Sequence, residues 1–449
     1  MAADREHQEQ HWKLLAARTT LGASLRTTAW LFGRWFSTYR KLFVLVVGAN
    51  GLLLGLSRHG LVDWQPDAAT VATANIFVAV LFRNELFVHL LHRVFVGACN
   101  PAIVPLRVRL QITSCLLYMG GMHSGFAVSG AVWLGVGLFA PAGPPEAAAP
   151  LLRMLGYLLL SLLTLMSLLA TKPVREACHN LFEYSHRYLG WTGLAVLWGF
   201  VWLSASGDPP ELAAHIQRLL AAAAFWLTLG ITVVVLVPWL TVRKVRVKTY
   251  SPSSGVIAIK FGGGFGVGAF GRISRTRLGD WHTFALVSRT RHATSHLMIV
   301  SAVGDFTQGL ISPPPPAELY VRAVKFLGLP YSLQSYNRAV IVATGAGIAP
   351  FMPLLLQAQH ANYHVVWIGR AFRETFGRRL SDLVLHWPQV TVWDTALKGR
   401  PNTLALAAQA YRAFGAEVVF IGCNPVATRE LVYGCSALGI PAFGPSWDS

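Results

Sequence analysis

AVIVATGAGIAPF, residues 339–351, is the stretch that decides the fold. Five apolar residues that suit a buried strand run into Thr344, Gly345 and Gly347, and Pro350 stands where a helix is expected to open. Glycines let a pyrophosphate approach the backbone, and the free amides of a helix N-terminus bind it. The stretch therefore predicts a dinucleotide-binding turn formed by Thr344, Gly345, Gly347 and Pro350, in preference to a plain tight turn.

Apolar runs alternate with helix-like segments in the rest of the C-terminal third. The runs cover residues 365–369, 390–393 and 418–422. Such alternation is typical of a parallel sheet covered by helices. We therefore expect residues 337–449 to form a Rossmann-like α/β domain that binds a nicotinamide dinucleotide.

Polar candidates follow two of these runs. Arg370 stands where NAD-selective sites tend to carry an acidic residue, and Arg373, Arg378 and Arg379 follow it. This favours NADPH over NADH, with an arginine-rich solvated helix face as the alternative. The end of the last run is expected to line the nicotinamide side with Gly422, Cys423, Asn424 and Pro425, although Cys423 also suits a small buried residue.

Residues 245–336 have a different sequence pattern, in which glycine and proline separate short runs of residues that favour β-strands. This pattern predicts a small antiparallel β-barrel. The glycine-dense stretch from Gly262 to Gly271 has no helix-forming pattern directly after it. We therefore interpret it as a mobile connection between strands rather than a loop that cradles a nucleotide.

Two segments of this region resemble a known flavin site. Gly279-Asp-Trp-His282-Thr-Phe284-Ala-Leu-Val-Ser288 and Gly304-Asp-Phe-Thr307 resemble the His-Pro-Phe-Thr and Gly-Asp-Trp-Thr segments of the NADPH oxidase and ferric reductase branch of the ferredoxin-reductase superfamily. The resemblance implies that FAD contacts His282, Phe284 and Ser288, and that residues 304–307 close the barrel beneath it. Thr283, Ala285 and Ser301 depart from the pattern, and Arg322 is the candidate to replace the missing phosphate-binding arginine. In this superfamily an aromatic side chain near the C-terminus covers the flavin, which points to Trp447, with Phe443 second.

A wider resemblance runs from about residue 75 to the C-terminus. The segments Trp367-Ile-Gly-Arg370, Glu374-Thr-Phe-Gly and Gly-Arg400-Pro-Asn, together with the C-terminal ending, resemble the TmpA-like transmembrane flavoproteins. Membrane halves of this kind are also fused to adenylation-type enzymes in that family. The resemblance implies an FAD- and NADP-dependent membrane oxidoreductase, with Cys423 and Trp447 beside the reacting rings.

The N-terminal half is strongly apolar. The chain is 53% hydrophobic and 13% charged, and its formal charge of +18 gathers where apolar runs end, which favours anionic lipid headgroups over nucleic acid as a partner. The five cysteines form no C-x-x-C pair, so neither a disulfide framework nor a zinc site is indicated. Six segments are long enough to cross a bilayer, at residues 41–57, 68–90, 110–140, 151–171, 181–205 and 216–240.

Histidines within these segments raise the question of haem. His123 follows two glycines and precedes Ser124-Gly125, and His186 lies in a segment that resembles a ligand-bearing helix of the ferric reductase fold. Their different depths, counted from the expected ends of the segments, argue against a shared haem. We favour close helix packing and hydrogen-bonded histidines over haem. Arg83, Asn84 and Glu85 are expected to form a buried polar cluster with Glu183 or Arg187.

Together these features predict a membrane α-helical bundle of about six helices joined to a ferredoxin-reductase-like module. The predicted units are a cytosolic N-terminal segment (1–40), the transmembrane domain (41–244), the FAD-binding barrel (245–336) and the NAD(P)-binding domain (337–449). Basic loops place the module and both termini on the cytosolic side of a cell membrane. Electrons would pass from NADPH through FAD to haem and ferric iron, a quinone or a lipophilic intermediate. The alternatives are a redox-sensing receptor or transporter, and a scaffold with a degenerate reductase.

Overall fold

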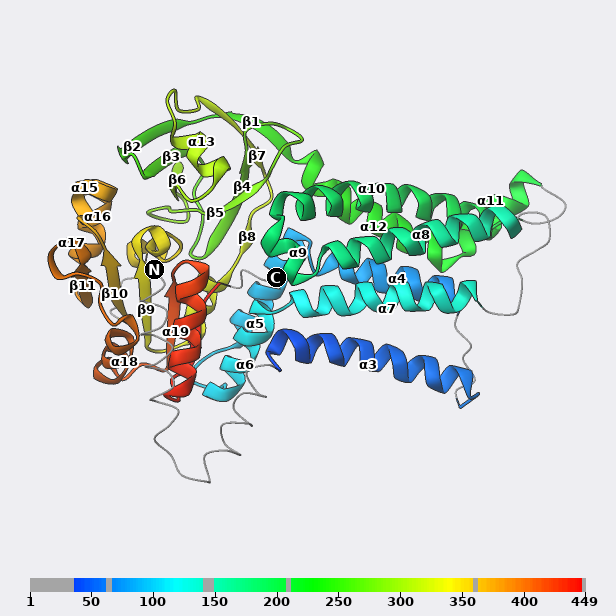
Figure 1. The fold of residues 1–449 in the computed structure, drawn as a ribbon, viewed down its shortest axis with the longest axis horizontal. Coiled ribbons are helices and arrows are strands. Elements are labelled where there is room, and N and C mark those ends of the chain that lie inside the picture. The colour runs from blue at the N-terminus through cyan, green and yellow to red at the C-terminus, as the bar shows by residue number, and fades with distance from the viewer. Residues whose placement is uncertain (1–35, 62–66, 140–148, 207–210, 358–361, 446–449) are drawn as a thin grey trace.

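The computed structural model describes residues 36–61, 67–139, 149–206, 211–357 and 362–445. The N-terminal half is helical, and Figure 1 shows most of its helices side by side, with the β-rich half at one end of the bundle. Its helices are α3 (Thr38–Arg58), α4 (Ala68–Leu81), α5 (Glu85–Ala98), α6 (Leu106–Leu117), α7 (Gly120–Leu138), α8 (Ala149–Leu169), α9 (Lys172–Ala177), α10 (His179–Ser204), α11 (Leu212–Ala221) and α12 (Ala223–Leu240).

All six predicted spans are mainly helical, but not all of them suit a membrane. Within the described residues, three helices are long and apolar enough to cross a bilayer: Thr38–Arg58, Pro150–Leu169 and Ala223–Leu240. The pair α4 and α5 qualifies as a fourth only if a bend of 73° is allowed within one span. The glycines of α7 lower its mean hydropathy. The polar side chains Glu183, His186 and Arg187 lower that of α10. The prediction of six spans is therefore not confirmed.

Helix α7 packs closely against α3 and α4 because its glycines present no side chain. A Cβ atom at Gly125 would lie 2.9 Å from Val46 Cβ, and one at Gly130 would lie 2.8 Å from Ile76 Cδ1. Close helix approach at small residues is a usual way to pack apolar helices. This is the packing that the glycines around His123 predicted.

The middle of the chain forms two antiparallel sheets of a small barrel. One sheet has the order β1-β7-β4-β5, with β8 paired to β4, and the other has the order β2-β3-β6. The elements are β1 (Val242–Arg246), β2 (Lys248–Ser253), β3 (Val256–Gly262), β4 (Ala269–Ser274), β5 (His282–Ala285), β6 (Ser295–Ser301), α13 (Asp305–Ile311), β7 (Glu318–Arg322), β8 (Phe326–Leu327) and the 3₁₀ helix η1 (Leu329–Ser335). The glycine-dense stretch connects β3 and β4, as a strand connection should.

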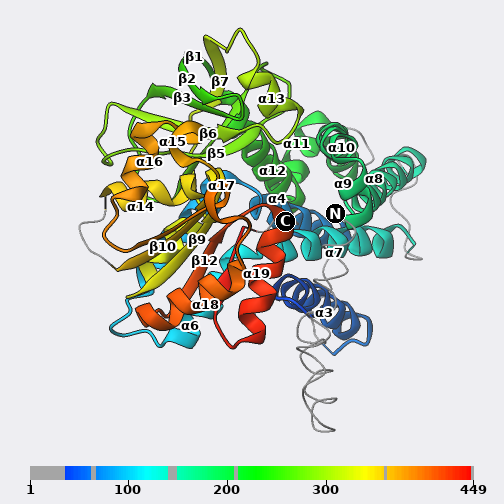
Figure 2. The same ribbon diagram turned by 60° about the vertical axis from the view of Figure 1, so that its left-hand side comes forward.

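The C-terminal part is a parallel sheet of order β11-β10-β9-β12-β13 with helices on both faces (Figure 2). Its elements are β9 (Ala339–Thr344), the 3₁₀ helix η2 (Gly345–Phe351), α14 (Met352–Gln357), β10 (Tyr363–Gly369), α15 (Phe372–Phe376), α16 (Arg378–Leu385), β11 (Val390–Asp394), α17 (Thr395–Lys398), α18 (Thr403–Phe414), β12 (Val418–Gly422), α19 (Pro425–Ala437) and β13 (Ala442–Phe443). Within β9, Ile341 belongs to the core on one face, while Val340 and Val342 belong to the core on the other. A strand buried on both faces reads as a continuous apolar run, as the sequence predicted.

Candidate functional site

The strand order of the parallel sheet reverses between β9 and β12, which places the candidate nucleotide crevice at the carboxyl ends of these two strands. From β9 the chain continues to β10 on one side, whereas β12 pairs with β9 on the other side. In open α/β sheets, ligands bind at such a reversal of strand order. The predicted turn at Gly345 lies there, directly after β9.

Gly345 has φ +55°, a left-handed conformation in which a side chain is strained. The carbonyl of the same residue accepts a hydrogen bond of 3.0 Å from Trp367 Nε1 on β10. The turn is therefore fixed by its backbone conformation and by a buried side chain of the neighbouring strand.

Gly347 and Gly422 pack backbone against backbone where β9 and β12 end. A Cβ atom on Gly347 would collide with the Gly422 carbonyl oxygen, and a Cβ atom on Gly422 would collide with the Gly347 carbonyl oxygen. Glycine at both positions thus allows the turn after β9 and the end of β12 to lie in direct backbone contact. Reciprocal packing of this kind has no signature in the sequence.

The helix after the turn differs from the prediction. Pro350 does not open an α-helix, because a 3₁₀ helix already runs over Gly345–Phe351 and Pro350 lies inside it. The α-helix begins only at Met352.

The residues after β12 have structural partners. Asn424 caps α19, since its side chain accepts a hydrogen bond of 2.9 Å from the Ala427 amide, and Pro425 occupies the first turn. Cys423 is 6% exposed, and burial raises the pKa of its thiol, which is hydrogen-bonded to Thr344. Its placement matches the small buried residue that we kept as the alternative, although the thiol lies beside the crevice.

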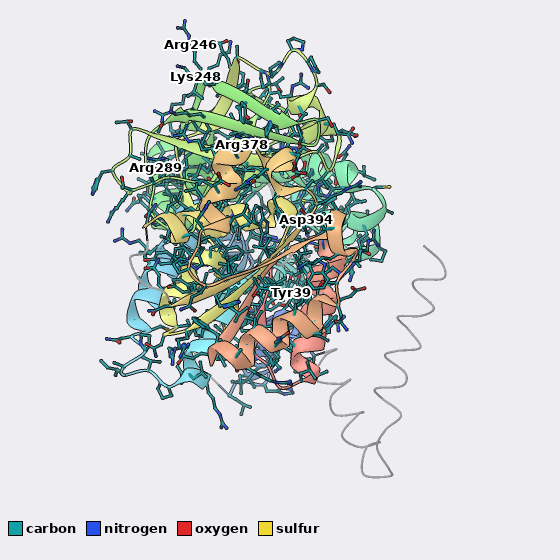
Figure 3. The ribbon with its side chains drawn as sticks, turned by 90° about the vertical axis from the view of Figure 1, so that its left-hand side faces the viewer. Tyr39, Arg246, Lys248, Arg289, Arg378 and Asp394 are labelled. Atoms are coloured by element: carbon teal, nitrogen blue, oxygen red, sulfur yellow. The ribbon has the colours of Figure 1, made fainter. Side chains whose placement is uncertain are left out.

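Arginines surround the carboxyl end of β10. Arg370, Arg378 and Arg379 are exposed, and Arg373 pairs with Asp382 at 3.0 Å. Figure 3 labels Arg378 above Asp394 on this face of the molecule. The Asp394 side chain accepts hydrogen bonds from the Ala371 and Ala396 amides at 3.0 and 2.8 Å. Asp394, the last residue of β11, is thus engaged with the backbone, and the exposed charged residues near Arg370 are three arginines and Glu374.

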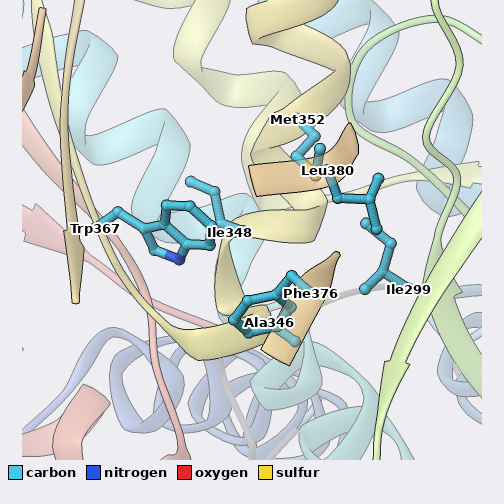
Figure 4. Close-up of a pocket in the computed structure, with 7 residues that line it drawn as sticks. All are labelled: Ile299, Ala346, Ile348, Met352, Trp367, Phe376 and Leu380. Carbon is cyan, nitrogen blue, oxygen red and sulfur yellow. The ribbon is translucent and has the colours of Figure 1, made fainter. Parts of the chain in front are cut away.

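The back of the glycine turn packs against the barrel. A cavity of about 10 Å³, lined only by apolar side chains that include Ile299, Ile348 and Trp367, lies between β6, η2 and β10 (Figure 4). That volume is no more than a water-sized void. The two domains are therefore in direct contact behind the turn, and a ligand would have to bind on the crevice side.

Strand β5, which carries the predicted flavin contacts, lies against η2. His282 stacks on Phe306 of α13 with ring centroids 3.9 Å apart, and Phe284 stacks on the same ring at 6.5 Å. Burial lowers the pKa of His282, and its Nε2 has no hydrogen-bond partner among the described residues. His282 and Phe284 therefore form one aromatic cluster, with an unsatisfied polar atom in it, next to the nucleotide turn.

Ser288, the third predicted flavin contact, is hydrogen-bonded to neighbouring segments. Its side chain is buried and accepts a hydrogen bond of 3.1 Å from the Phe265 amide, and its carbonyl accepts one of 2.9 Å from Gln357 Nε2. Gln357 also donates to the Phe265 carbonyl, and His296 Nδ1 lies 2.8 Å from the Gly263 carbonyl. The glycine-dense connection is therefore tied to its neighbours at several points, and its mobility stays a prediction.

Arg322 does not face a phosphate site. Its guanidinium lies 3.0 Å from Glu85 on α5, and it covers the rings of Trp239 and Trp281 at 4.9 Å each. Glu85 also pairs with Arg272 at 2.6 Å. The polar cluster around Glu85 thus uses two arginines of the barrel instead of Glu183 or Arg187, because α5 turns away from the bundle and lies against the barrel.

The two candidate haem ligands are neighbours. The rings of His123 and His186 lie 6.2 Å apart, so the argument from their depths was wrong. The chain breaks between α6 and α7 around Tyr118, and α7 begins only at Gly120, which brings His123 close to the start of its own helix. His123 Nδ1 lies 2.8 Å from the Ala79 carbonyl. Among the described residues, no group of three or more His, Cys, Asp or Glu side chains is placed to hold a metal ion.

Only one of the two aromatic candidates for covering the flavin lies within the described residues. Trp447 lies outside the described residues. Phe443, the second candidate, lies in β13 and contacts Phe420 with ring centroids 5.9 Å apart. Residues 1–35 of the predicted N-terminal segment (1–40) also lie outside the described residues.

A buried ion pair that the sequence analysis missed joins the helical half to the α/β domain. Arg109 of α6 pairs with Glu417, the residue before β12, at 3.0 Å and donates to the Ser335 carbonyl at 2.7 Å. Tyr336 donates to Thr113 Oγ1 at 2.9 Å. Arg109 and Glu417 are 308 residues apart, and no local pattern connects them.

Known proteins with similar sequences are reductases. Residues 329–449 match the family model of the C-terminal domain of adenylate-forming reductase 03009. Two proteins of the fungus Coprinopsis cinerea, adenylate-forming reductases 06235 and 03009, are 34% and 33% identical to this chain over 92% of its length. The chain spans about two fifths of the length of these relatives, since it covers 40% of each.

Solved structures resemble the chain only distantly. Phthalate dioxygenase reductase has a TM-score of 0.36 at 11% identity, covering 45% of this chain and 67% of its own. A flavohemoglobin from Malassezia yamatoensis with bound FAD and heme has a TM-score of 0.39 at 15% identity, covering 84% of this chain and 99% of its own.

Proposed function

We propose that this chain is an integral-membrane flavoprotein oxidoreductase that takes electrons from NADPH through FAD to a membrane-associated acceptor. The observation that carries the proposal is the crevice between β9 and β12, where the Gly345 turn and the Gly347–Gly422 contact lie at the reversal of strand order. The similarity to reductases supports the same chemistry. The resemblance to TmpA-like flavoproteins stays a prediction.

The residues around the crevice suit a phosphorylated dinucleotide. The helical stretch that begins directly after β9 and the absence of a side chain at Gly345 favour a pyrophosphate. The exposed Arg370 favours a 2′-phosphate, because its guanidinium can bind phosphate oxygens in pairs. We therefore expect NADPH to be preferred over NADH, and Arg370→Glu to reverse that preference.

The barrel wall of the crevice suits a flavin. His282 and Phe284 offer aromatic surface, and the Nε2 atom of His282 and the Nε1 atom of Trp281 are buried without partners among the described residues. Buried polar atoms without partners are rare in folded proteins and point to a ligand. When bound, FAD accepts a hydride from the nicotinamide and passes the electrons on. The protein's part is to hold the two rings together and to exclude water.

The helical half supports a position in a membrane. Large apolar side chains on the three candidate spans face outward, such as Leu45 (64% exposed), Leu168 (60%) and Val233 (50%). Apolar surface of this extent is costly in water. A lipid environment for these helices, with the module on the cytosolic side, is therefore part of the proposal.

Purification of the full chain in a mild detergent tests the proposal. We expect a flavin absorbance band that is bleached by NADPH and sustained NADPH oxidation when an artificial acceptor is supplied. A redox-sensing receptor or transporter would bind the nucleotide without turnover, and a degenerate scaffold would be colourless. Either result would contradict the proposal.

The contact between His123 and His186 favours haem as one candidate acceptor. Their rings lie 6.2 Å apart, and the hydrogen bond between His123 and the Ala79 carbonyl is of the kind that orients histidine ligands. These two side chains would ligate the iron, and haem would supply a one-electron acceptor within the bundle. A Soret band that His123→Ala and His186→Ala both abolish would support this candidate. A purified protein with flavin but no Soret band would leave a quinone or a lipophilic intermediate as the acceptor.

A further inference from the structure

A second cavity lies where three parts of the molecule meet. Its volume is about 680 Å³, and its walls come from α5, from the glycine-dense connection between β3 and β4, and from the start of the α/β domain. Ligand sites in proteins are usually about 300–1,000 Å³ in volume. The cavity is therefore large enough for a small molecule.

This cavity is separate from the nucleotide crevice. On the α/β side it is lined by Leu354 and Gln357 near the end of α14 and by Tyr363, the first residue of β10. Tyr363 marks the amino-terminal edge of the parallel sheet, whereas Gly345 and Gly422 lie at its carboxyl-terminal edge. A ligand in the cavity would therefore leave the crevice free.

The charged side chains that line the cavity are all cationic. Arg93 comes from α5, Arg291 from the loop after β5, and Lys325 from the segment before β8. Neither Arg93 nor Arg291 forms an ion pair with a described residue. Lys325 donates a hydrogen bond of 2.6 Å to the Arg322 carbonyl, and burial lowers the pKa of its ammonium group to about 8. Arg93 and Arg291 are exposed and Lys325 also interacts with Glu85, so the cavity has a cationic lining that favours an anion.

The glycine-dense connection forms a fixed wall. A Cβ atom on Gly264 would lie 2.9 Å from the Arg291 carbonyl oxygen, and one on Gly268 would lie 2.7 Å from Tyr331 Cα. Phe265 between them is held by two hydrogen bonds, because its carbonyl accepts one from Gln357 and its amide donates one to Ser288. The site is therefore already formed before a ligand enters, and Phe265 and Phe326 present aromatic surface to it.

Helix α5 places the cavity near the level expected for lipid headgroups. It is bent by 73° from α4, and its Leu86, Leu90 and Val94 are 49%, 54% and 55% exposed. His89 and Arg93, one turn apart, line the cavity. A helix with apolar side chains on one side and basic side chains on the other is typical of the membrane interface, where its apolar side contacts lipid.

We propose that this cavity binds a phosphate-bearing ligand, with its phosphate held by Arg93, Arg291 and Lys325 and its apolar part against Phe265 and Phe326. The ligand is either the headgroup of an anionic phospholipid or a soluble phosphate compound. Its binding joins α5, the barrel and the α/β domain, and thereby stabilises their arrangement by mass action.

Calorimetric titration of the purified full chain in a neutral detergent tests this. The probes are dihexanoyl phosphatidic acid and inorganic pyrophosphate, and the variants are Arg93→Gln and Arg291→Gln. Each loses a charge-assisted contact, so the dissociation constant should rise by about tenfold or more. The matched control is Arg289→Gln, an exposed arginine of the same loop that does not line the cavity (Figure 3). Thermal melting of each variant confirms that it is folded.

The pattern of binding then decides the outcome. Binding of the lipid probe alone, weakened in both variants and unchanged in Arg289→Gln, supports the proposal with a lipid headgroup as ligand. Binding of pyrophosphate with the same dependence supports it with a soluble ligand, because the nucleotide crevice does not involve Arg93 or Arg291. The proposal is overturned if neither probe binds, if both variants bind like the wild type, or if Arg289→Gln weakens binding equally.

Discussion

Replacing Glu85 by glutamine should loosen the junction between α5 and the barrel. Its carboxylate is 4% exposed and faces two guanidinium groups, Arg272 at 2.6 Å and Arg322 at 3.0 Å. Glutamine keeps the shape of the side chain but removes the charge. Two cations would then remain beside a neutral amide, with Arg322 still enclosed by Trp239 and Trp281.

The size of the effect follows from burial. Removing one partner of a buried ion pair costs about 3–5 kcal/mol. The Arg272 side chain is 33% exposed, and water screens part of its charge, whereas that of Arg322 is only 10% exposed. We therefore expect about 3 kcal/mol, which lowers the protection of the junction against opening by about a hundredfold.

Hydrogen–deuterium exchange of the detergent-purified protein measures this locally. Peptides that cover α5 and β7 should exchange about a hundredfold faster in Glu85→Gln. The control is Glu318→Gln in β7, which breaks an exposed pair with Lys244 and should leave the exchange rates nearly unchanged. Adding Arg272→Gln to Glu85→Gln should recover part of the loss, because one uncompensated cation is removed. Equal exchange in Glu85→Gln and Glu318→Gln would refute the reasoning.

Three further results are expected. Arg109→Gln should destabilise the contact between α6 and the α/β domain by about 3 kcal/mol, because it leaves the partly buried Glu417 without its cation. Hydrogen–deuterium exchange of peptides near β12 measures this, and wild-type protection there would contradict it. Burial lowers the pKa of His296 from 6.5 to about 4, so between these pH values the unfolded chain binds a proton that the folded chain does not. The free energy of unfolding should therefore fall by up to about 3 kcal/mol as the pH drops from about 6.5 to 4. Melting experiments on His296→Gln should show a smaller dependence on pH. Iodoacetamide should label the exposed Cys178 and leave the buried Cys423 unlabelled. If the Cys423 thiol only packs, Cys423→Ala should reduce its flavin at a rate within a few-fold of wild type. A large loss of that rate would indicate a catalytic role for Cys423.

Local patterns predicted the parts of the fold that depend on local chemistry. The apolar run 339–343 became a strand buried on both faces, and Gly345 took the left-handed conformation that its glycine permits. The short β-type runs expected within residues 245–336 became the strands of the barrel, among them β3 and β6. Periodicity and turn chemistry determine these features, so they can be read without tertiary information.

Features that depend on distant partners could not be read in this way. Glu85 and Arg322 are 237 residues apart, and the Gly347–Gly422 contact joins two separate strand ends. The bend after α4 did have a local signal, since Asn84 before Glu85 is a favourable helix start, and its side chain accepts hydrogen bonds from Leu86 and Phe87. The break at Tyr118 that brings His123 to His186 has no proline, and only the two glycines that follow hint at it.

The central claim is that the turn at Gly345 and Gly347 holds a pyridine nucleotide beside the flavin. Stopped-flow measurement of flavin bleaching by NADPH in Gly347→Ala tests it most directly, with Gly255→Ala as control, because a Cβ atom at Gly255 meets nothing within 4 Å. The added methyl group must displace the Gly422 backbone, and a displacement of about 1 Å at a reacting centre costs about a hundredfold in rate. The account predicts that loss in Gly347→Ala, with flavin content retained and a wild-type rate in Gly255→Ala. Bleaching at the wild-type rate in a folded Gly347→Ala protein would contradict it.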